Sequence, residues 1–240
     1  MKKQKRGRET AAELLARVQA DPAWGRVDGE REAKRQELAR RHKLAAAPVI
    51  EDLEQAGFSV DSLDELRHTR TTYRAAVPVL LKWLPVVPDA AVKESIVRAL
   101  SVPWAKPAAA GPLIAEFRNS SDPSSGLKWA IGNALAVVAD DTVFSEVSEL
   151  VRDRRNGKAR EMLALALSNM QDPRAVPLLV ELLDDAEMAG HAVLALGKVK
   201  WRGARPHLER FLDHPKSWVR KEAKRALAKL DKAERTAENP

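Results

Sequence analysis

The chain of 240 residues contains no cysteine. This absence excludes disulfide bonds, thiolate metal sites and cysteine nucleophiles together. Long hydrophobic runs are missing as well, because no apolar stretch approaches the roughly 18 residues that a membrane-spanning helix needs. Basic residues open the sequence over 1–8, but no unbroken apolar segment follows them, so we expect no secretory signal. These absences together favour a cytoplasmic protein without a membrane span.

Sequence motifs of common enzymes are also missing. The chain has neither a Gly-rich phosphate loop nor a His-Glu-x-x-His metal motif. His207 and His214 are close in sequence but have no carboxylate at ligand spacing, so we predict no metal site. No nucleophile-elbow motif supports a Ser-His-Asp triad. We therefore expect a protein that holds no cofactor and is not an enzyme.

The net charge of +7 is distributed unevenly along the chain. Residues 1–70 carry 15 basic and 13 acidic side chains, and residues 71–200 carry 15 of each. Residues 201–240 carry 11 basic and 6 acidic side chains, so most of the excess lies near the C-terminus. A basic end can contact nucleic acid, an acidic lipid surface or an acidic protein. It equally suits the solvated outer face of a terminal repeat.

A nine-residue pattern occurs five times between residues 92 and 227. It consists of an apolar residue, a basic residue, two free positions, an apolar residue, two free positions and an Ala-Leu step. The copies begin at Val92, Leu127, Ala159, Met188 and Val219, which are 35, 32, 29 and 31 residues apart. A period of this length indicates stacked units that cannot bury their apolar faces alone.

A second helical segment precedes each copy of the pattern. Four of these five segments carry a proline in the first turn of the helix, where a missing N–H group costs no hydrogen bond. Each unit is therefore predicted to be a helical hairpin whose second helix carries the nine-residue pattern. In the region before the repeats, we expect a short helix that begins at Pro48 and ends at Gly57.

These observations predict an all-α fold, a right-handed α-solenoid of about five helical hairpins with an N-terminal helical cap. The expected segments are a basic disordered tail over 1–8, the helical cap over 9–73, the five repeats over 74–231 and a second disordered tail over 232–240.

The five units resemble HEAT repeats, in particular the short bacterial kind that also occurs in phycobilisome-lyase-like proteins. The resemblance rests on the early proline of the first helix, a turn aspartate in some units and the apolar–basic pair that opens the second helix. Val92-Lys93, Leu127-Lys128 and Val219-Arg220 match this pair best, whereas Met188-Ala189 departs from it. Membership of this family implies a scaffold or adaptor; some members bind nucleic acid and a few are enzymes.

One side of the second helices is predicted to line the concave groove of the array. We call positions three and seven of each pattern, together with the residue after it, the second-helix row. The row consists of Glu94, Arg98, Ser101, Trp129, Asn133, Ala136, Glu161, Leu165, Ser168, Gly190, Leu194, Gly197, Lys221, Arg225 and Ala228.

The leading functional hypothesis is a non-enzymatic scaffold that binds a protein partner along this row. Aromatic and arginine side chains are the usual anchors at interfaces. The predicted partner-binding residues are Trp129, Asn133, Arg98, Glu161, Lys221 and Arg225. Inter-repeat packing is the alternative interpretation of Trp129, because tryptophan buries a large apolar area.

Two other hypotheses compete with the scaffold. Nucleic-acid binding would use the N-terminal arm and an aromatic–basic set in the last repeat. This set consists of Trp201, Arg202, Lys216, Trp218, Arg220, Lys221, Lys224 and Arg225. A lyase- or glycosylase-like enzyme is the third hypothesis. HEAT-repeat DNA glycosylases use groove tryptophans and an aspartate, but here Asn133 lies beside Trp129 and carries no negative charge to stabilise a cationic sugar.

Overall fold

The computed structural model describes residues 10–20, 22–69, 71–120, 126–199 and 201–238. All regular secondary structure in this part of the chain is helical. The chain divides into two compact units, with the boundary after Ala45. None of the described helices is long and apolar enough to cross a membrane. The predicted tail over 1–8 lies outside the described residues.

The N-terminal unit consists of α1 (Ala11–Ala20) and the first part of α2 (Pro22–Gln55). Thr10 and Glu13 form a capping box at the start of α1, in which each side chain accepts a hydrogen bond from the other residue's backbone N–H group. The described side chains of this unit are almost all exposed. Ion pairs between residues three apart, such as Arg40 with Glu37, support α2 along its own surface.

The prediction of a separate helix beginning at Pro48 is wrong, because α2 runs without a break from Pro22 to Gln55 and contains Pro48 in its interior. Proline removes one backbone hydrogen bond from a helix. The alanine-rich and charged residues on its N-terminal side are strong helix formers, and they carry the helix through this position. Gly57 ends the helix as predicted, with a φ of 90° that favours glycine.

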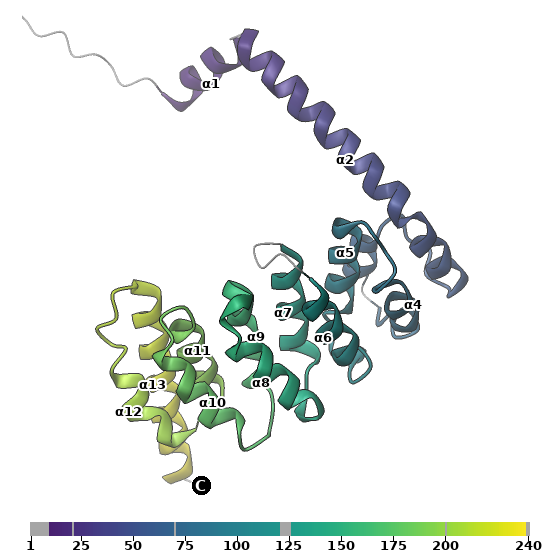
Figure 1. Ribbon diagram of the computed structural model, residues 1–240. Coiled ribbons are helices and arrows are strands. Elements are labelled where there is room, and N and C mark those ends of the chain that lie inside the picture. The colour runs from purple at the N-terminus through teal and green to yellow at the C-terminus, as the bar shows by residue number, and fades with distance from the viewer. Residues whose placement is uncertain (1–9, 21, 70, 121–125, 200, 239–240) are drawn as a thin grey trace, which may run out of the picture. The chain divides into compact units, whose positions relative to one another are not determined.

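The C-terminal unit begins within α2 and continues through α3 (Leu63–His68) into five helical hairpins (Figure 1). The hairpins are numbered here as repeats one to five. Their helix pairs are α4 (Ala76–Trp83) with α5 (Ala90–Leu100), α6 (Ala110–Asn119) with α7 (Gly126–Val138), α8 (Phe144–Arg152) with α9 (Arg160–Leu167), α10 (Ala175–Glu181) with α11 (Ala189–Val199), and α12 (Arg205–Glu209) with α13 (Ser217–Glu238).

Short 3-10 segments connect several of these helices. They are η1 (Pro103–Ala105), η2 (Asp141–Val143), η3 (Arg154–Ala159), η4 (Leu182–Asp184) and η5 (Arg202–Ala204). Each first helix packs on the second helix of its own repeat, and the second helices α5, α7, α9, α11 and α13 pack on one another in chain order. The predicted α-solenoid is confirmed.

The Ala-Leu steps of the pattern form the seam between the second helices. Both residues of the step are fully buried in repeats one to four, as at Ala134 and Leu135. In repeat five Ala226 is buried but Leu227 is only half-buried. No further described repeat covers α13, so its outer side remains in contact with solvent.

The C-terminal helix is longer than the repeat pattern. The sequence predicts a disordered tail over 232–240, but α13 continues to Glu238. Arg205 of α12 donates hydrogen bonds to Asp231 and Glu234, and these ion pairs fix the end of α13 against the first helix of its own repeat. Most residues over 232–238 are strong helix formers, and the ion pairs with Arg205 add a weak contact to α12.

Candidate functional site

Trp129 of the second-helix row stands beside a hollow between repeats one and two. It lies on α7 and is 44% exposed, which is a large exposed fraction for so apolar a side chain. The hollow has a volume of about 360 Å³. Its lining comes from α7, from the end of α5 and from the segment around α3, and consists of Arg67, Tyr73, Arg98, Ser101, Val102, Trp129, Ala130 and Asn133.

Polar contacts hold the lining of this hollow in place. Arg98 donates from Nε and one terminal nitrogen to Glu94 Oε1, at 2.9 and 2.6 Å. Asn133 donates from Nδ2 to the backbone oxygen of Trp129 at 2.9 Å, which occupies one of its two N–H donors within α7. Tyr73 donates to the backbone oxygen of Ala99 at 3.0 Å. Burial raises the pKa of Tyr73, so its phenol stays protonated at neutral pH.

Glu161, predicted on the same row, faces a histidine of the next repeat. His191 Nε2 lies 3.9 Å from Glu161 Oε2, and both side chains are largely buried. Burial lowers the pKa of His191, the charge of Glu161 opposes this effect, and the charge of Lys216 adds to it. The ring of Trp218 lies 5.4 Å from the ring of His191. The sequence analysis did not include His191, because its partner comes from another repeat.

The row is closed between repeats four and five. A Cβ atom placed on Gly190 would lie 2.1 Å from the Trp218 ring, and one on Gly197 would lie 2.7 Å from the Ala226 Cβ atom. Both glycines are buried. They therefore allow α13 to approach α11 closely, and the prediction that Gly190 and Gly197 line an open groove is wrong.

The aromatic–basic set predicted for nucleic acid does not form one cluster. Trp218 packs on Gly190 at the start of α11, whereas Trp201 follows the end of α11 and packs on Gly203 and the ring of His207. The two tryptophans thus mark opposite ends of a helix that is about 15 Å long.

Several cations of this set already have partners within the chain. Arg225 pairs with Glu222, and Arg220 donates to the backbone oxygens of His214 and Pro215 at 2.7 and 2.9 Å. Arg202, Lys216, Lys221 and Lys224 are exposed. Of these, Lys216, Lys221 and Lys224 belong to the part of the set around Trp218.

The basic residue at position two of the pattern has a structural role in three repeats. It reaches to the following repeat and binds a polar group there. Lys93 Nζ donates to Glu116 Oε1 at 2.7 Å, and Arg160 pairs with Asp185. Lys128 Nζ instead donates to the amide oxygen of Asn156 at 3.0 Å. These contacts join repeats one to two, three to four and two to three, and the sequence analysis did not identify any of them.

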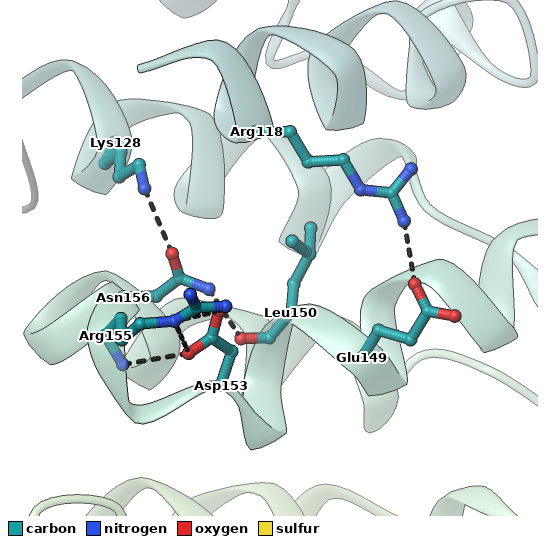
Figure 2. Close-up of polar contacts among 7 residues, drawn as sticks. All are labelled: Arg118, Lys128, Glu149, Leu150, Asp153, Arg155 and Asn156. Atoms are coloured by element: carbon teal, nitrogen blue, oxygen red, sulfur yellow. Dashed lines mark hydrogen bonds and ion pairs between the residues drawn. The ribbon is translucent and has the colours of Figure 1, made fainter. Parts of the chain in front are cut away.

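A cleft opens at the contact between Lys128 and Asn156 (Figure 2). Its volume is about 760 Å³. The cleft lies at the edge where each hairpin turns, and not on the second-helix row. The lining residues are Arg118, Lys128, Glu149, Leu150, Asp153, Arg155 and Asn156.

Most charges in this cleft are paired. Arg118 donates to Glu149 at 2.9 Å, and Arg155 binds both carboxylate oxygens of Asp153. Lys128 is only 7% exposed and lies over the ring of Phe117, with Nζ 4.9 Å from its centroid. Burial lowers the pKa of Lys128, and the negative charge of Asp153 offsets part of this effect. Asn156 also donates from Nδ2 to the backbone oxygen of Leu150 at 3.0 Å.

Chemically, these surfaces suit binding and offer no metal site. Within the described ranges, no three His, Asp or Glu side chains are placed to hold a metal ion together. The fold and the surfaces define an α-solenoid of short helical hairpins, with contact surfaces between successive repeats. Residues 110–189 match the family model for HEAT repeats. These residues thus form HEAT repeats within a longer array of helical hairpins. A comparison with curated proteins gave no significant match.

Proposed function

We propose that the chain is a non-enzymatic scaffold that binds a protein partner along the second-helix row, with Trp129 as the anchor. HEAT repeats generally serve as protein-interaction scaffolds. The observation that supports this role most directly is the 44% exposure of Trp129 beside a hollow lined by Arg67 and Arg98. Exposed tryptophan and arginine side chains next to a concave surface are the groups that contribute most to protein interfaces.

The chemistry of the hollow favours binding over catalysis. Its described lining contains two arginines and a protonated tyrosine but no carboxylate. A glycosylase-like reaction needs a negative charge to stabilise a cationic sugar, and this surface would oppose it. A partner with an apolar side chain for Trp129 fits the same surface, and Arg98, which already pairs with Glu94 through Nε and one terminal nitrogen, keeps its other terminal nitrogen for a hydrogen-bond acceptor on that partner.

The test is to capture partners from the native cell extract and to compare single variants for their affinity. For a partner that the wild type captures, Trp129→Ala should lower the affinity by about 30-fold or more, since anchor residues contribute about 2 kcal/mol or more. Trp201→Ala is the matched control, because Trp201 is also exposed, at 40%, but lies far along the array. Equal binding by Trp129→Ala and wild type would remove the proposal.

Nucleic-acid binding is the alternative function, and it rests on a smaller surface than the full predicted set. Lys216, Lys221 and Lys224 are exposed around Trp218, which is itself 41% exposed. Phosphate binding by these lysines would make affinity fall steeply with salt. Lys221→Glu with Lys224→Glu should then abolish a gel shift seen at low salt. The absence of any gel shift by the wild type at low salt would end this alternative.

We also propose that the chain acts in the cytoplasm. The lack of cysteine supports a reducing compartment. Localisation of a fluorescent fusion to another compartment would contradict this part of the proposal.

A further inference from the structure

The cleft between repeats two and three differs from the two neighbouring junctions in one chemical respect. Lys93 and Arg160 each reach a carboxylate of the following repeat, Glu116 and Asp185 respectively. Lys128 occupies the same position of its repeat but meets the neutral amide oxygen of Asn156. A carboxylate that the other two junctions contain is therefore replaced here by an amide.

Among the described residues that line the cleft, one positive charge is left without a counterpart. Arg118, Lys128 and Arg155 contribute three positive charges, and Glu149 and Asp153 contribute two negative charges. The two arginines pair with these two carboxylates, which leaves Lys128. An ammonium group has three donors, and the hydrogen bond to Asn156 is the one that Lys128 makes within the described residues.

Burial makes this unpaired charge costly for the folded chain. Lys128 is 7% exposed, and a buried ammonium group is stable only when opposite charge or good acceptors surround it. The ring of Phe117 and the oxygen of Asn156 supply part of that stabilisation. The cleft beside Lys128 gives a ligand access to this charge, and its volume of about 760 Å³ admits a side chain or a small organic acid.

We propose that this cleft binds a single carboxylate group, which pairs with Lys128 and takes the place that Glu116 and Asp185 fill at the other junctions. One negative charge neutralises the lining, whereas a phosphate monoester would exceed it. The carboxylate belongs to an acidic side chain or to a small organic acid, and both sources share this chemistry. The cleft shares no residue with the hollow beside Trp129. An experiment can therefore contradict the carboxylate site without contradicting the proposed scaffold function, and the reverse.

The first experiment measures the pKa of Lys128 by NMR in protein labelled with ¹³C at the lysine side chains. Propionate, which has the same end group as a glutamate side chain, is added and compared with chloride at equal ionic strength. Propionate should raise the pKa of Lys128, because a neighbouring negative charge favours the protonated amine. Exposed Lys158 is the internal control, and its side-chain signals should respond equally to propionate and chloride. A pKa of Lys128 that responds equally to propionate and chloride would overturn the proposal.

The second experiment compares variants for their affinity. Lys128→Met should weaken propionate binding about tenfold or more, the loss expected for one charged hydrogen bond. Lys158→Met lies nearby on η3 and should bind as the wild type does. Circular dichroism of both variants verifies that they are folded. If Lys128→Met retained full affinity, the assignment of the carboxylate to this cleft would be wrong.

The two sources of the carboxylate are separated with a capped Gly-Glu-Gly peptide and its Gly-Gln-Gly counterpart. Tighter binding of the glutamate peptide than of propionate supports an acidic side chain of a partner. Binding of propionate without the peptide supports a small organic acid. Equal binding of the glutamine and glutamate peptides, or tighter binding of inorganic phosphate than of propionate, would overturn the proposed carboxylate site.

Discussion

Arg160 and Lys128 occupy the same position of consecutive repeats and are both buried, yet their surroundings differ in charge. Arg160 is 1% exposed, donates from Nε to the backbone oxygen of Val151 at 2.7 Å and pairs with Asp185. Lys128 is 7% exposed, and its partners among the described residues are an amide oxygen and an aromatic ring. Within the described part of the chain, the same repeat position therefore holds one cation that pairs with a carboxylate and one that does not.

The pKa directions follow from this difference. Burial would raise the pKa of Asp185, but the hydrogen bonds from Arg160 and from the backbone of Glu187, with the charges of Arg160 and Arg154, lower it. For Lys128, burial is the largest effect and lowers the pKa. The charged form is thus favoured at the junction of repeats three and four and penalised at the junction of repeats two and three.

A third kind of junction joins repeats four and five. Ala189 stands where the other repeats carry a cation, so no ion pair from this position links the two repeats. Close packing replaces it, since Trp218 lies on Gly190 and Ala226 lies against Gly197. The comparison teaches that the cation at position two links three of the four junctions, whereas close helix contact occurs at more than one of them. Gly132 of α7 packs against Met162 of α9 at the Lys128 junction, much as Gly197 packs against Ala226.

The largest loss of stability is expected when the ion pair between Arg160 and Asp185 is broken by removing Arg160. Arg160→Ala should lower the free energy of unfolding by about 3–5 kcal/mol, because it leaves Asp185 without its main partner and Val151 without its donor. Urea denaturation followed by circular dichroism measures this loss.

Arg154→Ala is the matched control for this measurement. Arg154 lies 3.8 Å from the same carboxylate of Asp185, but its side chain is 81% exposed. Its removal should change the stability by no more than about 0.5 kcal/mol. Equal losses for the two variants would show that burial of the cation does not determine the strength of this junction.

A smaller loss is expected at the packed junction. Gly197→Ala adds a Cβ atom 2.7 Å from the Ala226 Cβ atom and 3.2 Å from the Ala226 Cα atom, so α11 and α13 must move apart. The unfolding free energy should fall by about 1–3 kcal/mol. The control is Gly111→Ala on α6, where no atom lies within 4 Å of the added Cβ atom. The free energy of unfolding of Gly111→Ala should rise by about 0.5–1 kcal/mol. A rise for Gly197→Ala as well would contradict the packing argument.

Local sequence predicts the repeats well because their core is periodic. The nine-residue pattern predicted that Leu100, Leu135, Leu167, Leu196 and Leu227 are buried. The first four are fully buried, whereas Leu227 in the last repeat is only half-buried. The turn aspartate of the first repeat, Asp89, caps the second helix, because its side chain accepts hydrogen bonds from the backbone N–H groups of Ala91 and Val92. These features depend on neighbours a few residues away, so one repeat is sufficient to identify them.

Contacts between repeats could not be predicted in the same way. The partner of each cation lies more than 20 residues away in the turn or first helix of the next repeat, as Asn156 does for Lys128. The closure of the row at Gly190 depends likewise on where Trp218 of the next repeat points. The sequence placed Trp129 on the second-helix row but left inter-repeat packing open as its alternative role. It did not predict the cleft at Lys128, because the basic position was interpreted only as a feature of the family pattern.

The smallest effect, and the sharpest test of the comparison, is expected from Lys128→Met. At neutral pH the free energy of unfolding of the variant should differ from that of the wild type by about 1 kcal/mol or less, because the substitution removes both a costly buried charge and a hydrogen bond.

The sign of this difference in stability should depend on pH. The folded-state pKa of Lys128 is lowered, so below it the cost of the charge is fully present. As the pH rises through that value toward about 10.4, the pKa of an unfolded lysine, the folded amine loses its proton and the wild type gains stability relative to the variant. Contributions of ionisable groups that the two proteins share cancel in this difference. A difference that does not change with pH, or a loss as large as that of Arg160→Ala, would show that Lys128 is as well compensated as Arg160.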